Sequence, residues 1–233
     1  IESDLREKEK QERCWGRDSL GTIHGIAKDW ANGEPYVQSR YAQDITDRPA
    51  VMVSRRKTSL LRELDQVEAV LVRSREANAL VIGDETVQKK NLLAMFVSRI
   101  REGSIFPQLE HKRVFVFRTA GFADTVTDAR GFEHELATVF REAISAGNII
   151  LVFEDFPALL AIAKRLGATM GTVIRDFLSS PYLQVVAFAD NGAFHASIEQ
   201  DEVLKEYFEP VFFRHRIAAP SNRRRCETAS AAP

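Results

Sequence analysis

The sequence predicts an α/β protein in which helices cover both faces of a five-stranded parallel sheet. Short runs rich in Val, Ile, Leu and Phe alternate along the chain with stretches whose apolar residues recur at helical spacing. The short runs are apolar almost throughout, as in strands that are buried on both faces. The helical stretches between them are typical of the crossovers that join parallel strands.

The composition is that of a globular chain with no overall electrostatic preference for a partner. Its 233 residues are 45% hydrophobic and 28% charged, which excludes a disordered or collagen-like chain. The net charge is −1, so no global field attracts nucleic acid or anionic lipid. No apolar run approaches the roughly 18 residues that a membrane span requires. The two cysteines, Cys14 and Cys226, exclude a disulfide framework and favour the cytoplasm.

The two ends of the chain are expected to lie outside the sheet. Residues 1–49 combine a charged opening with a connecting arm in which Gly, Pro and aromatic residues are scattered. Residues 214–233 carry five Arg against one Glu and lack periodicity, which predicts a disordered basic tail. Residues 50–213 are therefore expected to form the α/β domain. Because the chain opens on Ile1 and a run too charged for a secretory signal, we expect a fragment of a longer protein.

Residues 50–213 supply the expected elements in order. An amphipathic helix is expected over 55–75, where Leu and Val recur on one face. Strands are expected at Ala79–Ile82, Val114–Phe117, Ile149–Phe153, Gln184–Phe188 and Val211–Phe213. Helices are expected at 89–101, 131–145, 157–178 and 199–207, with a break between Gly167 and Gly171. The core is expected to contain Phe188, Phe194, Phe208, Phe212 and Phe213.

The loop after the first expected strand is the first candidate site, because open parallel sheets bind ligands at the carboxyl ends of their strands. It reads Gly83-Asp84-Glu85-Thr86-Val87-Gln88-Lys89-Lys90. Aligned on G-x-x-x-x-G-K-[ST], it keeps Gly83 and Lys89, but Gln88 replaces the second Gly and Lys90 replaces the hydroxyl that binds Mg²⁺. The loop is therefore either a degenerate site for ATP or ADP with Mg²⁺, or a plain strand-to-helix junction with a solvated lysine pair.

A pair of carboxylates follows the third expected strand. This strand ends in Glu154-Asp155, the reverse of the Asp-Glu order in which the Asp holds the metal and the Glu polarises the attacking water. Glu154 can reach a metal through its extra methylene, whereas Asp155 is then too short to address the same water. The alternative is a solvated pair with no catalytic part.

These segments together resemble the first ATPase module of the Clp-type AAA+ unfoldases and disaggregases. Asn78–Gly83 is similar to the strand that leads into the phosphate loop, and Gly147–Asp155 to the metal-binding strand. Phe132–Leu136 resembles the helix start after the pore loop, and Ile198–Val211 the segment that ends in the arginine fingers. The resemblance implies the large subdomain of a P-loop NTPase, a part in protein unfolding by a chaperone assembly, and other AAA+ subunits or further copies as partners.

The functional positions depart from the family pattern. Glu206-Tyr207 stands where the family has paired arginines, and Ala189 or Asp190 stands at the polar sensor. The stretch 123–130 has no aromatic residue to grip a polypeptide, and we expect its neighbour Phe122 in the core. The small helical lid of the family is expected to be absent, because the chain ends soon after Phe213.

Three functions follow from these patterns. The first is a pseudo-ATPase with a structural or partner-docking role, in which hydrolysis is lost and the vestigial catalytic positions are Glu154, Asp155, Asp190, Glu206 and Tyr207. The second is a divergent ATP-binding Clp subunit in which Lys89 meets phosphate and Glu154 holds Mg²⁺. The third is a monomeric anion-binding module that uses Lys89 and Lys90. A zinc site and a nucleophile elbow are not expected, since the histidines lack ligand spacing and G-x-S-x-G is missing.

Overall fold

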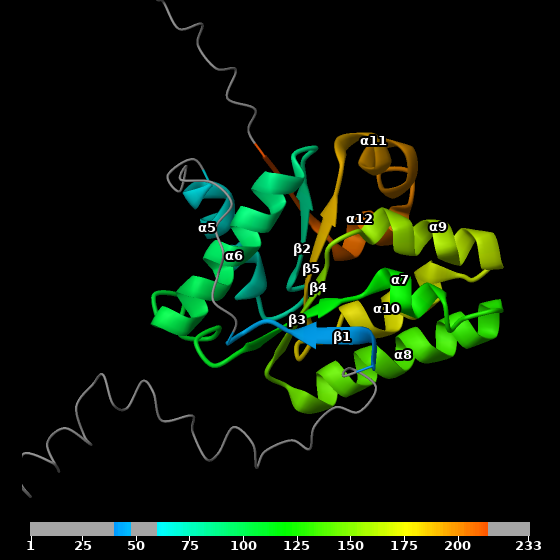
Figure 1. The fold of residues 1–233 in the computed structure, drawn as a ribbon, viewed down its shortest axis with the longest axis horizontal. Helices are drawn as coiled ribbons and strands as arrows, with labels where there is room; N and C mark the ends of the chain where they lie inside the picture. The colour runs from blue at the N-terminus through cyan, green and yellow to red at the C-terminus, as the bar shows by residue number, and fades with distance from the viewer. Residues whose placement is uncertain (1–39, 48–59, 214–233) are drawn as a thin grey trace, which may run out of the picture.

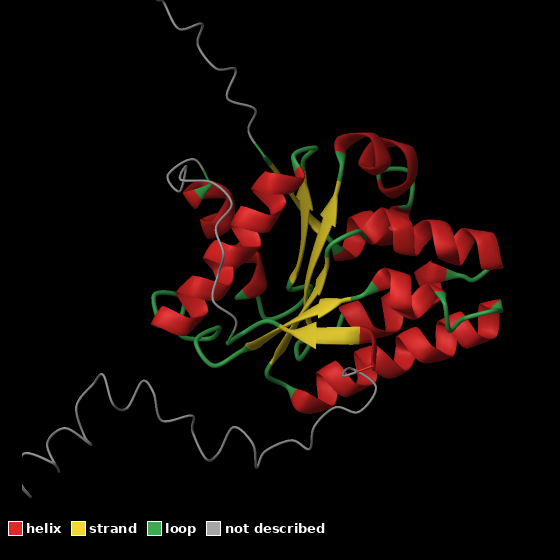
Figure 2. Cartoon of the chain, viewed as in Figure 1, coloured by secondary structure: helices red, strands yellow, loops and turns green. Residues whose placement is uncertain are grey.

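The computed structural model describes residues 40–47 and 60–213 (Figure 1). It contains a six-stranded sheet in the order β1-β3-β4-β5-β2-β6, with helices packed on both faces (Figure 2). The strands are β1 (Ala42–Asp44), β2 (Asn78–Ile82), β3 (Arg113–Phe117), β4 (Ile149–Phe153), β5 (Gln184–Ala189) and β6 (Glu209–Phe212). The expectations for the charged opening and the basic tail fall outside the described residues.

The five strands expected from the sequence are present as β2 to β6, and all their pairings are parallel. The expectation of a five-stranded, wholly parallel sheet is wrong in one respect, because β1 adds an antiparallel edge strand beside β3. This strand is only three residues long and reads Ala-Gln-Asp, which carries no strand pattern. Its position depends on distant partners: Arg113 donates two hydrogen bonds to Asp44, at 2.9 and 2.6 Å.

The helices agree in outline with those expected. Their bounds are α5 (Leu61–Leu71), α6 (Thr86–Glu102), α7 (Thr119–Ala123), α8 (Ala129–Ala146), α9 (Phe156–Leu166), α10 (Met170–Leu178), α11 (Asn191–Ala193), the π-turn η2 (Phe194–Ile198) and α12 (Glu202–Tyr207). The expected break between α9 and α10 is confirmed, since Gly167 ends α9 with φ +71°. α6 begins at Thr86, before the periodic stretch that predicted it, and α7 was not expected.

Each face of the sheet has its own apolar core. Alternate residues of β2 point to opposite faces: Ala79 and Val81 pack with α5 and α6, and Leu80 and Ile82 pack with α8, α9, α10 and α12. This is why the strands read as continuous apolar runs. The burial of both faces leaves the loops at the carboxyl ends of the strands as the place where polar side chains gather.

The aromatic residues bear out most of the core expectation. Phe122 is fully buried and meets the Tyr41 ring edge-on at 5.2 Å, so its expected core role is confirmed. Phe188, Phe194 and Phe208 are buried as well. The expectation for Phe212 is wrong: its side chain is 48% exposed, because β6 is an edge strand and only Val211 of its end points into a core.

No helix in the described part of the chain is long and apolar enough to cross a membrane.

Candidate functional site

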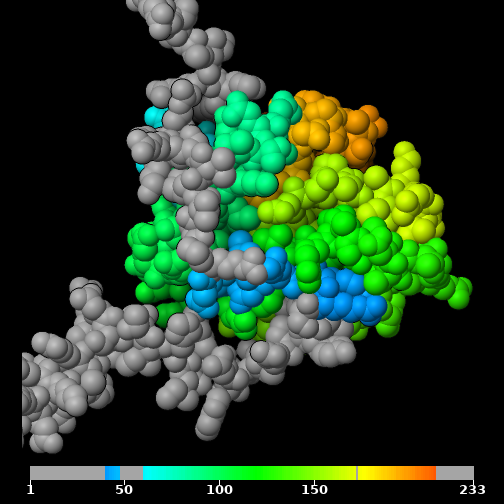
Figure 3. All heavy atoms as spheres, in the orientation of Figure 1, coloured from blue at the N-terminus to red at the C-terminus, as the bar shows by residue number. Residues whose placement is uncertain are grey.

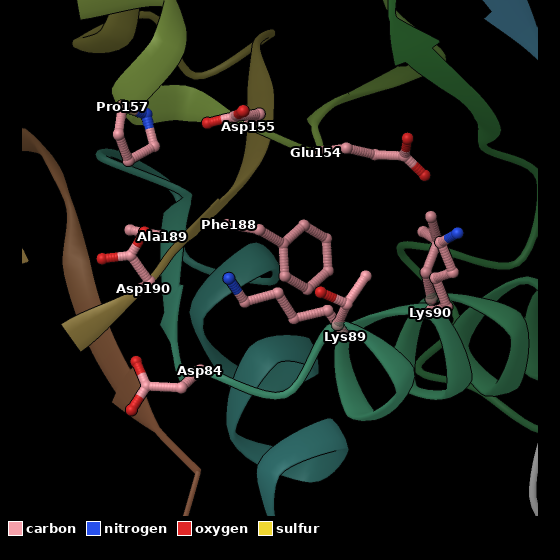
Figure 4. A pocket seen from close by; sticks show the side chains of 11 residues that line it. Asp84, Lys89, Lys90, Glu154, Asp155, Pro157, Phe188, Ala189 and Asp190 are labelled. Atoms are coloured by element: carbon pink, nitrogen blue, oxygen red, sulfur yellow. The ribbon is translucent and has the colours of Figure 1, made fainter. Parts of the chain in front are cut away.

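A cleft of about 370 Å³ lies at the carboxyl ends of β2, β4 and β5. In the space-filling view the start of α6, the start of α9 and the segment after β5 meet on the visible face (Figure 3). The residues that line the cleft are Asp84, Thr86, Lys89, Lys90, Leu93, Glu154, Asp155, Pro157, Phe188, Ala189 and Asp190 (Figure 4). The structure thus brings together candidates from three separate segments of the sequence.

The loop between β2 and α6 is shorter than a phosphate-binding loop. Only Gly83, Asp84 and Glu85 separate the strand from the helix. The backbone N–H groups of Gln88 and Lys89 donate to the carbonyl of Glu85, at 3.0 and 3.2 Å. These two amides form the first helical hydrogen bonds of α6, so they do not point into a phosphate cradle as the aligned motif requires.

Gly83 is required by packing. A Cβ atom built on it would overlap the ring of Phe213, and its φ is not in the left-handed region. Its N–H donates to the carbonyl of Ala189 at 3.1 Å, which continues the pairing of β2 with β5. Gly83 therefore lies at a close approach of two strands, and it does not line the cleft. The same holds for Glu85, Val87 and Gln88, which are absent from the cleft lining.

Two of the acids in the cleft cap helices. Asp155 Oδ1 accepts from the N–H of Ala158 at 3.1 Å at the start of α9. Asp190 Oδ1 accepts from the N–H of Ala193 at 2.6 Å at the start of α11. Each carboxylate therefore satisfies backbone donors of its own segment. Glu154 is exposed and makes no hydrogen bond with any described residue.

Asp84 makes the contact that the sequence analysis missed. Its carboxylate accepts from both the backbone N–H and the side-chain amide of Asn191, at 2.9 and 2.7 Å. Asn191 directly follows Asp190, which the sequence analysis placed at the polar sensor. The sequence places Asp84 just after a buried strand. No local pattern indicates that it bonds Asn191, which lies 107 positions away.

Lys89 is one of the two lysines that line the cleft. Burial lowers the pKa of its ammonium group, while the charges of Asp190, Asp155 and Asp84 raise it in part. Its ammonium points to the end of the cleft where Asp84 and Asp190 lie, and Lys90 lies toward the other end (Figure 4). Within the described part of the chain, Lys89 forms no ion pair.

The charge of the cleft does not favour a free polyphosphate. Four carboxylates line the cleft against two ammonium groups, so the local charge opposes a polyphosphate. The described residues contain no group of three or more His, Cys, Asp or Glu side chains that could hold a metal ion. Glu154 and Asp155 are therefore a pair without a third ligand in this part of the chain.

Glu206 and Tyr207 lie away from the cleft. They end α12, where the carbonyl of Tyr207 accepts from the side-chain amide of Asn78 at 3.1 Å. Asn78 begins β2, so Glu206 and Tyr207 lie near the amino end of this strand, whereas the cleft lies at the carboxyl ends. Glu206 is exposed, whereas the side chain of Tyr207 is buried.

A second, wider cleft of about 910 Å³ adjoins the first and shares Leu93, Glu154 and Asp155 with it. It extends along β3 and α7, where Arg40 and Arg118 contribute two cations that the sequence analysis did not single out. The carboxylate pair after β4 therefore lies between the two clefts.

No family model matches the chain. Among curated proteins, it is 24% identical over 152 residues to the chaperone ClpB of Aquifex aeolicus, a match that covers 65% of this chain and 15% of ClpB. It is 26% identical over 201 residues to ClpB of Meiothermus ruber, a match that covers 84% of this chain and 23% of that protein. It is 28% identical over 152 residues to a ClpA homologue of Guillardia theta, which is described as the ATP-binding subunit of an ATP-dependent protease. This match covers 64% of this chain and 18% of that protein.

Solved structures of Hsp104 from S. cerevisiae share the fold. The Hsp104:casein complex superposes with a TM-score of 0.62 at 18% identity, over 76% of this chain and 30% of that one. The Hsp104-ADP complex gives 0.62 at 19% identity, over 75% and 30%. The resemblance to Clp-type AAA+ proteins and the α/β fold are thereby confirmed. The chain spans less than a quarter of the length of the curated relatives described above.

Proposed function

We propose that this chain is a pseudo-ATPase module with a structural or partner-docking role in a Clp-type protein-remodelling assembly. Its partners would be other AAA+ subunits or further copies of itself. The proposal keeps the AAA+ framework that the relatives share and assigns no hydrolysis to it. The cytoplasm remains the proposed compartment, on the low cysteine content.

The observation that carries the proposal is the path of the backbone after β2. α6 starts at Thr86 and uses the N–H groups of Gln88 and Lys89 in its own hydrogen bonds. A phosphate cradle needs such N–H groups turned toward the anion. The helix instead begins where the aligned motif would still be loop, so the main source of affinity for the β-phosphate is missing.

The charges of the cleft act in the same direction. Asp84, Asp155 and Asp190 surround the ammonium of Lys89, and all three act on it electrostatically. These carboxylates offset part of the cost of burying the Lys89 charge. Productive hydrolysis would also need the arginine finger, for which Glu206 offers the opposite charge, and loss of that group alone lowers the rate by about 10³–10⁵.

One observation favours a second function, a divergent ATP-binding subunit. Lys89 is half-buried within the cleft and has no ion-pair partner among the described residues. A lysine that binds a phosphate group would have these two properties before the ligand arrives. In that case Lys89 would meet the phosphates and Glu154 would hold Mg²⁺. A third function, a monomeric anion-binding module, would use Lys89 and Lys90 without nucleotide specificity.

Calorimetry separates these functions. ATP and ADP with Mg²⁺ are titrated into the full chain, into Lys89→Ala, and into Lys90→Ala as the matched lysine control. The pseudo-ATPase proposal expects no saturable binding at millimolar nucleotide in all three proteins. Micromolar binding that Lys89→Ala abolishes and Lys90→Ala retains would overturn it in favour of the second function. Phosphate binding without preference for nucleotide, weakened in both variants, would favour the third.

The docking role needs a separate measurement. Light scattering is recorded for the chain over a range of concentrations, alone and with a full-length active Clp-type ATPase. The proposal expects self-association or a stable complex with the ATPase. A chain that stays monomeric under both conditions would contradict the docking role.

A further inference from the structure

Asp84 and Asn191 tie together two loops at the carboxyl ends of paired strands. Asp84 follows β2 and Asn191 begins α11 after β5, and β2 and β5 pair from Asn78 to Ile82. Asp84 Oδ1 accepts from the backbone N–H of Asn191, and Oδ2 accepts from its side-chain amide. We call these two hydrogen bonds the Asp84–Asn191 latch. Because both carboxylate oxygens are used, the side chain of Asp84 has a fixed direction.

The latch fixes most of the β2–α6 loop. The loop consists only of Gly83, Asp84 and Glu85, and the N–H of Gly83 already donates to Ala189 of β5 at 3.1 Å. Two consecutive loop residues are therefore bound to the end of β5 and the residue that begins α11. A loop held in this way needs no ligand to remain ordered.

The latch also holds a negative charge beside Lys89. The Asp84 carboxylate lies at the end of the cleft to which the Lys89 ammonium points, and its charge acts on that ammonium (Figure 4). An oxyanion that paired with Lys89 at this end of the cleft would lie near this carboxylate. Like charges repel, so the carboxylate lowers the affinity of the cleft for an oxyanion.

We infer that the Asp84–Asn191 latch is an autoinhibitory contact, which closes the β2–α6 loop without a ligand and excludes polyphosphate oxyanions from Lys89. The inference rests on the proposed function, because it explains how the cleft stays closed when no nucleotide is used. It adds that the Asp84 side chain lowers the affinity of the cleft for oxyanions, and that part of this affinity appears when the side chain is removed.

Inorganic pyrophosphate is the probe that tests the latch. It is titrated by calorimetry into the full chain and into Asp84→Ser, Asp84→Asn and Glu85→Gln. Asp84→Ser removes the charge and the two carboxylate oxygens that accept the hydrogen bonds, and Asp84→Asn removes the charge at constant size. Glu85→Gln is the matched control, because it removes the same charge from the neighbouring residue, whose carboxylate accepts from the side-chain amide of Gln88.

The latch predicts at least about tenfold tighter pyrophosphate binding in both Asp84 variants, and less than about threefold change in Glu85→Gln. The double variant Asp84→Ser with Lys89→Ala should lose the gain. Hydrogen exchange of the Asn191 amide should become faster in Asp84→Ser and stay unchanged in Glu85→Gln, since only the former removes its acceptor. Equal gains in Asp84→Asn and Glu85→Gln, or an unchanged Asn191 amide in Asp84→Ser, would overturn the latch.

The failure of the latch differs from the failure of the proposed function. If the unaltered chain binds ATP with micromolar affinity, the proposed function fails, whatever the Asp84 variants do. If the unaltered chain does not bind and the Asp84 variants gain no affinity, only the latch fails, and the pseudo-ATPase proposal stands.

Discussion

The ring of Phe213 lies so close to the backbone of Gly83 that a β-carbon on Gly83 would overlap it. Phe213 directly follows β6, and its N–H donates to the carbonyl of Ile82 at 2.9 Å, which extends the pairing of β6 with β2. In the aligned nucleotide-binding motif, this glycine begins the phosphate-binding loop. Here the same position admits an aromatic ring of the chain itself.

Replacing Gly83 by Ala should therefore lower the free energy of unfolding by about 1–3 kcal/mol, because the added carbon must displace the Phe213 ring. Gly121→Ala is the control, since no atom lies within 4 Å of its β-carbon position. Urea denaturation of both variants checks the difference. Unchanged stability of Gly83→Ala together with a loss of nucleotide affinity would mean that the glycine serves a ligand after all.

The pair Arg99 and Glu68 joins α6 to α5. The guanidinium donates to Glu68 at 2.7 Å and to the exposed Asp65 at 2.8 Å, and the Glu68 residue is only 3% exposed. Arg99→Met should lower the free energy of unfolding by about 3 kcal/mol, because it leaves a buried carboxylate without its partner. Arg73→Met removes an exposed pair with Glu209 of similar length and should change it by less than about 1 kcal/mol. Similar losses in the two variants by urea denaturation would refute this reasoning.

The sequence predicts the parallel sheet because its strands are buried on both faces. Such strands are continuous apolar runs, which can be recognised without knowing their partners. Ile149–Phe153 was found with the bounds that β4 has in the structure. β1 is different, because Ala42–Asp44 is held by Arg113 from β3 and by the hydroxyl of Thr46. These are side-chain contacts, most of them with distant residues, so the residues of β1 themselves carry no pattern that predicts a strand.

The residues of the candidate site also differ in whether the local sequence indicates them. Glu154, Asp155 and Asp190 could be named from the sequence because they follow buried strands, and Lys89 could be named because it stands at the lysine position of the aligned motif. The role of Asp84 could not, since it depends on Asn191 from another segment. The start of α6 at Thr86 was missed because the motif alignment favours a longer loop, whereas in the structure Thr86 to Lys89 already belong to the helix.

Thr46 provides a test of how β1 is attached. Its buried hydroxyl accepts from the N–H of Val114 at 2.8 Å and donates to Asp44 at 2.6 Å. Thr46→Val keeps the shape and leaves the Val114 N–H without this acceptor, so the free energy of unfolding should fall by about 1–3 kcal/mol. Thr138→Val, whose hydroxyl only donates to the carbonyl of His134 in its own helix, should change it little. Equal stability of Thr46→Val and the unaltered chain in urea would show that β1 does not depend on this contact.

The stability of the fold should depend on pH through Glu68. Burial raises the pKa of its carboxyl group, although the Arg99 guanidinium lowers it in part. Between the ordinary and the raised pKa, the folded chain keeps a proton that the unfolded chain has released. The free energy of unfolding contributed by Glu68 therefore falls as the pH rises through this interval, and it is fully present only below it.

Glu68→Gln removes the titrating group at nearly constant size. Relative to the unaltered chain, this variant should become progressively more stable as the pH rises through the interval, with a constant difference on either side. Urea denaturation at a series of pH values measures the difference, and Glu102→Gln supplies the same change at an exposed position. Parallel pH profiles for Glu68→Gln and the unaltered chain would show that the Arg99 contact offsets the burial of Glu68 completely, contrary to the raised pKa.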